Sequence, residues 1–217
     1  MTELEALRER HSVRNYKDTK IDKETLDKLF AFIEKCNADG NLNIQLCPDA
    51  GNTYNRLMNK AMGLGSAPSV IACVGKEADN LDERVGYYGQ KIVLFAQSLG
   101  LNTCWTGTYN QKNVPAVVGD DERLVIVIAL GYGVNPGRVR KSKSIEQVTK
   151  AENMPEWFKA GVEAALLAPT AINQQKFEIK LNDDNTVDFI DKGGILSKID
   201  IGIVKYNFEV GSKSVDK

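Results

Sequence analysis

The sequence predicts an α+β fold in which helices and strands alternate along one chain. Three observations lead to this prediction. Apolar residues recur at helical spacing in several segments, short runs of strand-forming residues lie between them, and no low-complexity linker or break in composition divides the chain. The 217 residues are 42% hydrophobic and 26% charged, which is typical of a folded soluble protein with a sizeable core. We therefore expect residues 1–217 to form a single domain.

The first two helices are expected at residues 2–9 and 21–36. Asp22 is a suitable N-cap for the second helix, because its carboxylate can accept a hydrogen bond from a backbone N–H of the first turn. The apolar residues of that helix that should face the core are Leu26, Leu29, Phe30 and Ile33.

Residues 37–55 are polar and rich in Gly and Asn, which predicts a loop with one short strand near "NIQL". "APSVIACVG" at 67–75 reads as a buried strand. The run "RLVIVIALGYG" at 123–133 is the most apolar, and its continuous large residues predict a strand in the middle of the sheet, buried on both faces.

Residues 82–99 form the longest predicted helix, which Gly100 ends. Its apolar face consists of Val85, Tyr88, Ile92, Phe95, Ala96 and Leu99. Gly86 and Gly89 lower the helix propensity. Either they permit the close approach of another helix or a ligand, or the helix simply tolerates them.

The last third begins with a helix at 154–168 that has Pro155 in its first turn. "KFEIKL" at 176–181 and "TVDFID" at 186–191 alternate with period 2 and are joined by the turn-forming "NDDN". This pattern predicts a β-hairpin.

The net charge of −1 gives no general attraction to nucleic acid or to an anionic membrane. No segment has the pattern of a signal peptide, and no apolar run approaches the roughly 18 residues of a membrane span. We expect a cytoplasmic protein whose basic clusters act locally, on a small anionic ligand and not on a polymer.

Cysteine and histidine usage also narrows the chemistry. Cys36, Cys47, Cys73 and Cys104 form no CxxC pair, which favours reduced thiols. With His11 as the only histidine, a His-based metal site or a Ser/His/Asp triad has little support, and we expect no metal. His11 itself is open to two interpretations, a donor to a ligand or a solvent-facing loop residue.

The stretch "RERHSVRNY" at 8–16 contains three arginines and the histidine. If residues 10–14 are extended, Arg10, Ser12 and Arg14 point to one side and offer two guanidinium groups and a hydroxyl to one ligand. Guanidinium binds phosphate through charge-assisted, often bidentate hydrogen bonds.

A second basic cluster, "GRVRKSK", follows the central strand and contains Arg138, Arg140, Lys141 and Lys143. Taken separately, each cluster is more typical of a solvated loop. Brought together by the fold, the two would form a phosphate site.

Four motifs, near residues 10–14, 103–107, 138–143 and 168–175, resemble those of the nitroreductase family of FMN-dependent oxidoreductases. "RHSVRNY" is similar to the family's Arg-(Arg/His)-Ser-x-(Arg/Lys) phosphate motif, and "APTAINQQKFEI" to its Pro-Ser-x-x-Asn-x-Gln-Pro-Trp stretch. "LGLNTCWTG" resembles the family's flavin loop, and "RKSK" its basic pair. The resemblance implies the nitroreductase fold, with a mixed central sheet flanked by helices and FMN at a homodimer interface.

The order of these motifs departs from the usual one, because the Pro-Ser-x-x-Asn match comes near residue 170 and not after the first helix. This order is similar to that of a divergent branch, the TM nitroreductases. It leaves open which subunit supplies "PTAINQQ" to a given flavin. The final Pro-Trp is replaced by Gln175-Lys176, which predicts a more polar edge.

Carried over to this chain, the resemblance implies that Arg10 and Ser12, with His11 beside them, hold the FMN phosphate together with Lys141 and Lys143. Arg14 would place a cation at the flavin pyrimidine, where it stabilises the negative charge of reduced FMN.

Thr106 and Gly107 would present backbone N–H groups to N5 and O4 of the flavin. The family often has an acidic residue where Thr106 stands, although a backbone donor does not depend on its side chain. Asn59 and Lys60 in "MNK" are candidates for further pyrimidine contacts and are not assigned. The residues expected to line the ring and ribityl chain are Pro169, Thr170, Ala171, Asn173 and Gln174.

The implied activity is ping-pong hydride transfer from NADH or NADPH, through flavin N5, to an electron-poor acceptor such as a quinone or nitroaromatic. It requires no catalytic side chain, and we interpret Cys104 as inert packing because no basic residue is near it in the sequence. Three alternatives stay open. They are a non-catalytic FMN-binding protein, a different flavin chemistry on the same fold (dehalogenation, flavin breakdown or dehydrogenation), and a phosphate-binding module without flavin.

Overall fold

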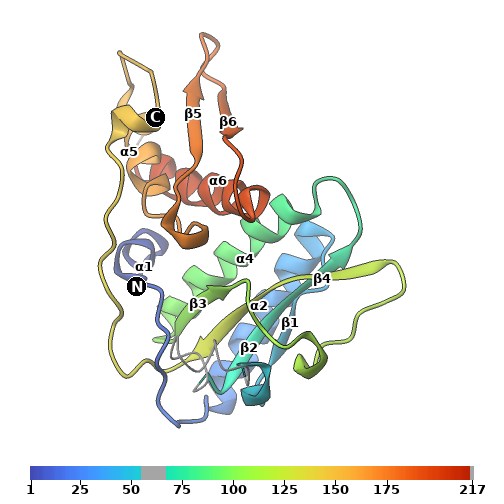
Figure 1. The fold of residues 1–217 in the computed structure, drawn as a ribbon. Helices are drawn as coiled ribbons and strands as arrows, with labels where there is room; N and C mark the ends of the chain where they lie inside the picture. Colours follow the sequence, from blue (N-terminus) through green and yellow to red (C-terminus); the bar gives the residue numbers. More distant parts are fainter. Residues whose placement is uncertain (55–66, 216–217) are drawn as a thin grey trace. The chain divides into compact units, whose positions relative to one another are not determined.

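The computed structural model describes residues 1–54 and 67–215, which fall into two units that interleave along the sequence (Figure 1). Unit 1 consists of Met1–Glu9, Asp82–Lys91 and Arg140–Lys217, and unit 2 of Arg10–Leu81 and Ile92–Val139. The organisation of residues 1–217 as one domain stays a prediction.

Unit 2 is built on a four-stranded sheet in the order β1-β2-β4-β3. The strands are β1 (Gln45–Cys47), β2 (Ser69–Lys76), β3 (Asn102–Thr106) and β4 (Glu122–Gly131). They pair antiparallel throughout, and β2 shifts register between Cys73 and Val74. The parallel component of the expected mixed sheet is an isolated bridge between Ser12 and Thr103 at the outer edge of β3. The central position predicted for residues 123–133 is confirmed.

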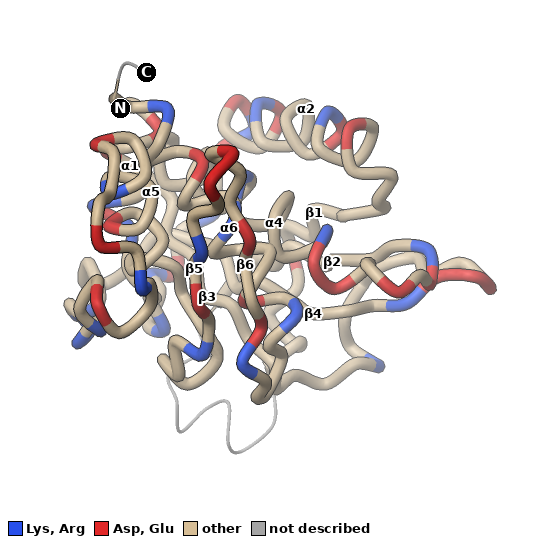
Figure 2. Tube along the Cα trace, turned by 90° about the horizontal axis from the view of Figure 1, so that it is seen from above, with Lys and Arg blue, Asp and Glu red and all other residues tan. Residues whose placement is uncertain are grey.

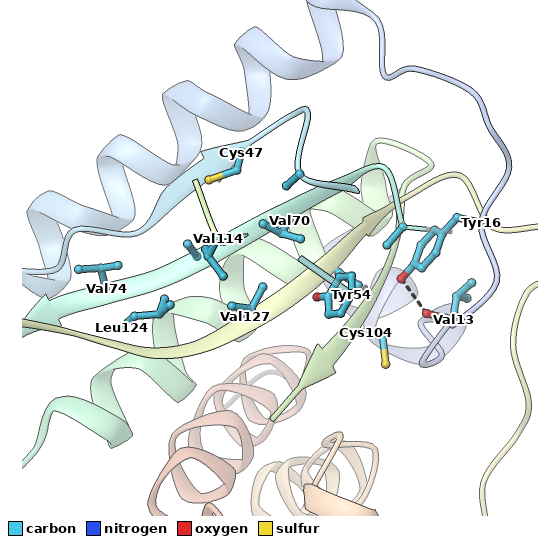
Figure 3. Close-up of a cluster of buried hydrophobic side chains, with 14 residues drawn as sticks. Val13, Tyr16, Cys47, Tyr54, Val70, Val74, Cys104, Val114, Leu124 and Val127 are labelled. Atoms are coloured by element: carbon cyan, nitrogen blue, oxygen red, sulfur yellow. Dashed lines mark hydrogen bonds between the residues drawn. The ribbon is translucent and has the colours of Figure 1, made fainter. Parts of the chain in front are cut away.

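One face of this sheet covers a cluster of buried apolar side chains, shown in Figure 3. Val70 of β2 and Val127 of β4 lie at its centre with Tyr54, and all three are fully buried. The alternating residues Ile71 and Ile128 point to the opposite face and are also fully buried. Both faces of the two central strands are therefore packed, as the continuous apolar runs predict.

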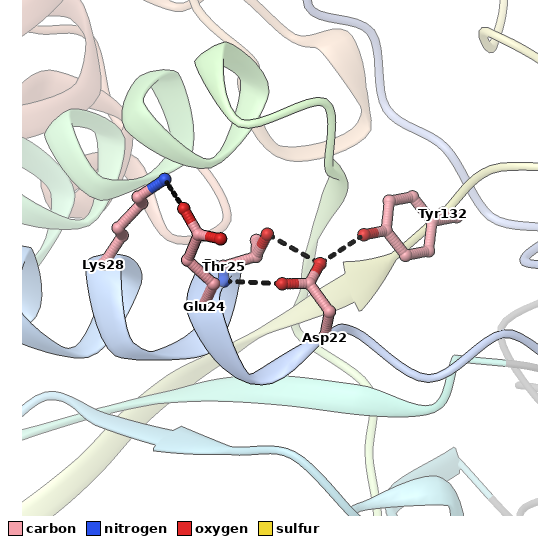
Figure 4. Close-up of polar contacts among 5 residues, drawn as sticks. All are labelled: Asp22, Glu24, Thr25, Lys28 and Tyr132. Carbon is pink, nitrogen blue, oxygen red and sulfur yellow. Dashed lines mark hydrogen bonds and ion pairs between the residues drawn. The ribbon is translucent and has the colours of Figure 1, made fainter.

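Helix α2 (Lys23–Gly40) begins at the predicted N-cap. Asp22 accepts hydrogen bonds from the Thr25 backbone N–H (2.9 Å) and the Thr25 hydroxyl (2.8 Å), as Figure 4 shows. These two donors lower the pKa of the Asp22 carboxyl. The helix continues four residues past the predicted end at 36, and Asn41 closes it in the left-handed conformation.

The prediction that Phe30 faces the core is wrong, because 55% of this residue is exposed. Instead Phe32 stacks on Phe95 of α4 (Leu81–Ser98), with ring centroids 4.1 Å apart and an interplanar angle of 14°. Helical spacing alone does not decide which of two nearby aromatic residues meets a partner.

Charges of both signs alternate along α2, as Figure 2 shows. Lys23 pairs with Asp27 and Lys28 with Glu24, each at 2.6 Å and one turn apart. Such exposed pairs contribute little to stability. Positive and negative side chains are mixed on this surface, in agreement with the near-zero net charge. The exposed face of α2 is therefore neither a basic nor an acidic patch.

The 3-10 turns η1 (Gly51–Tyr54) and η3 (Gln111–Asn113) complete the described elements of unit 2. Unit 1 contains the helices α1 (Glu3–Glu9), α5 (Glu156–Ala165) and α6 (Ser197–Lys213), the strands β5 (Phe177–Leu181) and β6 (Val187–Asp191), and the turns η4 (Ile145–Gln147) and η5 (Ala171–Asn173). Pro155 is the N-cap of α5. β5 and β6 form the predicted antiparallel hairpin, visible beside α6 in Figure 1.

The sequence analysis assigned no element to residues 197–213, which form the long helix α6. Its first turns alternate isoleucines (Ile199, Ile201, Ile203) with Asp200 and Gly202, so the local pattern has the period of a strand. The structure instead has a helix in which residues 199–204 are all buried, so no polar face gives the helical period that would have predicted it. Like the other helices within the described ranges, α6 lacks the length and apolar character that a membrane span requires.

Two glycines let α6 approach the first half of α4 closely. A Cβ built on Gly86 would lie closer than 3.0 Å to the carbonyl oxygen of Ile199, and one built on Gly202 would meet the carbonyl oxygen of Glu83 in the same way. Gly86 therefore serves the close approach of a second helix, one of the two roles considered for it. Backbone atoms cannot move aside as a flexible side chain can.

We expect Gly86→Ala to lower the free energy of unfolding by about 3 kcal/mol, the upper end of the cost of overpacking, because the added methyl group meets backbone. Urea denaturation measures the loss. Gly51→Ala is the matched control, since the nearest atom to its Cβ is 4.0 Å away. Equal stability of the two variants would contradict the close packing of α4 on α6.

Asp22 should make stability depend on pH. Because its folded-state pKa is lowered, its contribution is present above the unfolded value near 4 and is lost as pH falls through the folded value. Asp22→Ala should therefore lower the urea midpoint at pH 7 and lower it less at pH 3. Asp183→Ala, in the exposed β5–β6 turn, is the control. A gap between Asp22→Ala and wild type that is constant over this range would exclude the effect.

Candidate functional site

The segment that follows Arg10 is attached to the sheet of unit 2 at two points. The Val13 N–H donates to the carbonyl of Thr103 at 3.0 Å, beside the parallel bridge of Ser12 to the same residue. Tyr16 forms a second bridge, to Gly133 beyond the end of β4. The predicted phosphate motif is therefore held along the outer edge of β3.

Three predicted site residues surround the thiol of Cys104 on β3. Burial raises the pKa of this thiol, while Arg14 and Arg10 and a hydrogen bond from Ser12 act in the opposite direction. Arg10, Ser12 and Arg14 therefore share Cys104 as a neighbour, and their arrangement on one side of an extended segment stays a prediction. No basic residue is near Cys104 in the sequence, but the fold brings Arg10 and Arg14 near it. Burial has the larger effect on its pKa and keeps the thiol protonated, in agreement with the interpretation of Cys104 as inert.

Arg10 and Arg14 differ strongly in exposure. Only 5% of Arg10 is exposed, whereas Arg14 is exposed to solvent. A guanidinium in a buried position is desolvated, so an anion that reaches it is bound more strongly than at the surface.

His11 has a buried polar atom that stands out. Among the residues that the structure describes, no group forms a hydrogen bond with its Nδ1, which is inaccessible to solvent. A buried polar atom in a native protein nearly always has a partner. This nitrogen fits a ligand with a hydrogen-bonding oxygen, and the interpretation of His11 as a solvent-facing residue is not supported.

The loop after β4 packs directly on His11. Gly137 has φ +86°, and a Cβ there would lie 2.8 Å from the Cβ of His11 and 3.2 Å from the carbonyl oxygen of Ser12. Only glycine fits this position. Arg138 follows it and is exposed, so within unit 2 the start of the second basic cluster lies beside the first.

The predicted flavin loop lies at the other end of β3. The Thr106 hydroxyl donates to the carbonyl of Val127 at 2.8 Å and lies 2.9 Å from the hydroxyl of Tyr54, so this side chain belongs to the core. Gly107 follows and is exposed. Thr106 is three residues, about 10 Å, along the strand from Thr103, which Ser12 pairs with.

In unit 1, the remaining predicted residues form one hydrogen-bonded group. The side chain of Asn173 donates to the carbonyl of Lys141 at 2.9 Å. Lys143 contacts Gln175 twice, with its backbone N–H to the side-chain oxygen (2.9 Å) and with Nζ to the main-chain carbonyl (2.6 Å). The structure thus joins "RKSK" to "PTAINQQ".

The guanidinium of Arg140 binds the backbone of its own unit. Its guanidinium donates to the carbonyl of Leu167, and the Ser142 hydroxyl donates to that of Leu166 at 3.3 Å, both just beyond the C-terminal end of α5. Burial lowers the pKa of Arg140 to about 10. Lys141 and Lys143 alternate with these two residues along the chain, and their predicted role toward a phosphate stays a prediction.

The segment from Pro169 to Gln175 has a strained backbone. Ile172, Asn173 and Gln175 all have positive φ, of 45°, 58° and 45°. Each non-glycine residue in this region costs about 1 kcal/mol or more. Ile172 is β-branched and 84% exposed, so no burial of its side chain offsets the strain.

Gln175 does not form the polar edge that the sequence predicted. It is 3% exposed, and its amide donates to the carbonyl of Lys141 and to the side chain of Asn173, each at 3.1 Å. Pro169 is also buried. The polar residue is turned inward, where it connects Lys141, Lys143 and Asn173.

Asp200 is a site residue that the sequence analysis missed. It is 7% exposed and binds Ala171 and Gln174, both predicted flavin contacts. Burial raises the pKa of its carboxyl to about 6. The one signal in the sequence is that Asp200 stands between apolar residues, and it can be read only if residues 197–213 are first recognised as a helix.

Other candidate features do not overlap these groups. A pocket of about 370 Å³ in unit 1 is lined by Tyr87, Trp157, Phe189, Lys205, Phe208, Glu209 and Ser212, none of them a predicted flavin contact. Within residues 1–54 and 67–215, no cluster of His, Cys, Asp or Glu could hold a metal ion. All four cysteines are buried free thiols. Asn59 and Lys60 lie outside the described residues.

The comparison with solved structures shows the fold. A protein from Thermotoga maritima MSB8 described as a "putative nitroreductase" matches with a TM-score of 0.71 and 24% identity, covering 99% of this chain and 85% of that one. A protein from Desulfovibrio desulfuricans described as a "putative nitroreductase in complex with FMN" matches with a TM-score of 0.57 and 17% identity over 71% of this chain and 99% of that one. A Parabacteroides distasonis protein described as a "Putative NADH dehydrogenase/NAD(P)H nitroreductase" matches with a TM-score of 0.54 and 20% identity over 70% of this chain and 98% of that one.

No curated protein matches this sequence. The family model described as "Putative TM nitroreductase" matches residues 3–212, nearly the whole chain. The matched range spans the positions of all four motifs that carried the resemblance. The chain therefore belongs to the TM nitroreductase family.

Proposed function

We propose that this protein is an FMN-dependent oxidoreductase that uses NADH or NADPH to reduce small electron-poor acceptors such as quinones and nitroaromatics. The observation that carries the proposal is the buried Nδ1 of His11, which has no partner among the described residues and lies in a basic motif held against β3. Membership of the family and the FMN complex of the Desulfovibrio relative support FMN as the ligand.

The residues of unit 2 have the chemistry for a phosphate and an isoalloxazine edge. Arg10 supplies a desolvated guanidinium, Ser12 a hydroxyl and His11 a ring nitrogen to phosphate oxygens. Arg14 supplies an exposed cation for the pyrimidine edge, which favours negative charge there. Gly107 has no side chain to prevent the approach of a ligand to its backbone N–H.

Lys141 and Lys143 of unit 1 are proposed as further phosphate contacts. Lys143 gives one of its three ammonium hydrogens to Gln175, which leaves two for a ligand. Pro169, Thr170, Ala171, Asn173 and Gln174 are proposed to line the flavin by backbone and shape, because the amide groups of Asn173 and Gln174 already donate within the protein.

When bound, FMN supplies two-electron hydride chemistry at N5. The chain's own residues bind, orient and exclude water, and we propose no catalytic side chain. The buried thiol of Cys104 has a raised pKa and is not a nucleophile. By resemblance to the family, we also propose a cytoplasmic homodimer with FMN at the subunit interface.

The visible absorption spectrum of the purified protein tests this function. We expect added FMN to give a bound-flavin band that bleaches when NADH or NADPH is added anaerobically and returns when a quinone is added. The recovery shows that the reducing equivalents pass to an acceptor and separates an enzyme from a flavin carrier.

Two results would contradict the proposal. A flavin band that neither nicotinamide bleaches would indicate a non-catalytic flavoprotein or a different reductant. Absence of any bound-flavin band would leave a phosphate-binding module, which binding of inorganic phosphate would then identify.

Arg10→Ala should weaken FMN binding by about 1.5–3 kcal/mol, the scale of a lost charged hydrogen bond, or about 10- to 100-fold in Kd. A fluorescence titration of FMN measures this change. Arg8→Ala, which removes an exposed arginine two residues away, should leave the Kd unchanged.

Ser12→Ala is a second test of the same motif. It removes no buried charge, so this variant is expected to fold normally. It should weaken FMN binding by about 1 kcal/mol, the scale of a neutral hydrogen bond. Unchanged Kd values for both Arg10→Ala and Ser12→Ala would remove this motif from the flavin site.

A further inference from the structure

The strained segment 170–175 needs an external support. Its backbone turns through three positive φ angles at non-glycine residues, which an isolated chain rarely adopts. Such a conformation persists only where the surroundings hold it. The contacts that oppose the strain should therefore be identifiable among its neighbours within unit 1.

Two groups of contacts hold this segment. In the first, Lys141 and Lys143 bind Asn173 and Gln175, as described above. In the second, the carboxylate of Asp200 accepts the N–H of Ala171, at 3.0 Å and 3.2 Å to its two oxygens. The side-chain amide of Gln174 donates to the same carboxylate at 2.8 Å.

Gln174 also connects the segment to the loop before α6. Its amide donates to the carbonyl of Ile195 at 2.8 Å. Gly194, with φ +133°, lies so close that a Cβ there would overlap the amide oxygen of Gln174. The side chain of Gln174 therefore lies between Asp200, which belongs to α6, and the loop of Gly194 and Ile195.

The carboxylate of Asp200 is buried, where its desolvation costs free energy. Asp200 is nearly buried, its pKa is raised by burial, and its acceptors serve only this segment among the contacts known for it. A buried carboxylate is not a device for stability, because its desolvation is costly. Its position is explained if the shape of the segment matters.

We propose that Asp200 is the positioning residue of the flavin-lining segment: by binding Ala171 and Gln174 together, it holds residues 170–175 in the shape that receives FMN. This inference rests on the proposed function for its ligand. It does not require Asp200 to touch the flavin, because the contacts of Asp200 are with Ala171 and Gln174 of the chain itself.

Amide hydrogen exchange of the FMN-free protein tests the hold directly. Asp200→Ala should speed exchange in peptides covering 168–176 at least tenfold, while peptides from the rest of α6 keep their wild-type rates. Asp200→Asn, which retains one acceptor oxygen, should give a smaller increase. Asp184→Ala, an aspartate of the exposed β5–β6 turn, is the matched control and should change neither segment.

The same variants are then titrated with FMN. Asp200→Ala should raise the Kd at least fivefold, Asp200→Asn less, and Asp184→Ala not at all, and the absorption bands of the bound flavin should shift only in the Asp200 variants. A merely structural role would raise exchange throughout unit 1 and leave these bands unchanged. If Asp200→Ala does not fold, Gln174→Met is used instead. It removes the hydrogen bond from the Gln174 amide to Asp200 and keeps the carboxylate.

The outcomes separate the inference from the proposed function. Unchanged exchange in 168–176 overturns the hold, whether or not FMN binds. Faster exchange with an unchanged Kd and spectrum overturns its role in flavin binding. A wild-type protein that binds no FMN overturns the proposed function and the ligand part of this inference, while the exchange rates still decide whether Asp200 shapes the segment.

Discussion

The pairing of β4 on both sides is the constraint on which unit 2 depends. β4 is buried along most of its length, so its backbone groups must find partners in β2 and β3. β3 then becomes an edge strand, and Ser12 uses that edge. A shift of register by one residue would turn the alternate side chains to the opposite face, so the position of the basic motif follows from the packing of the sheet.

In unit 1, helix α6 has the corresponding role. Its glycines permit close contact with the first half of α4 and, at Gly211, with Ala160 of α5. Asp200 lies in the first turns of this closely packed helix and accepts hydrogen bonds from Ala171 and Gln174. The segment "PTAINQQ" is held in its conformation by Asp200 and by contacts with residues 140–143, because its positive φ angles are unfavourable for its own residues.

Burial sets the chemical character of the polar groups in both units. It keeps the thiol of Cys104 protonated in spite of two arginines and lowers the pKa of the guanidinium of Arg140. These groups are used for packing and for holding backbone carbonyls. The protein side chains near the predicted site are therefore suited to binding and orienting, which agrees with a family whose chemistry is performed by a cofactor.

The sequence by itself determined the features that depend on neighbouring residues. The N-cap at Asp22, the β5–β6 hairpin and the central strand all carry local signals, and these were predicted correctly. The roles of the individual motif residues toward FMN were also predicted, and they stay predictions.

Only the tertiary structure decided the features that depend on distant partners. Phe32 and not Phe30 packs inward because Phe95 lies opposite it, residues 197–213 form a helix because their isoleucines are buried, and Gln175 turns inward because Lys141 and Lys143 meet it. Local patterns specify periodicity and turns, but burial and hydrogen-bond partners are set by residues far apart in the chain, and these govern the strained segment and its acceptor Asp200.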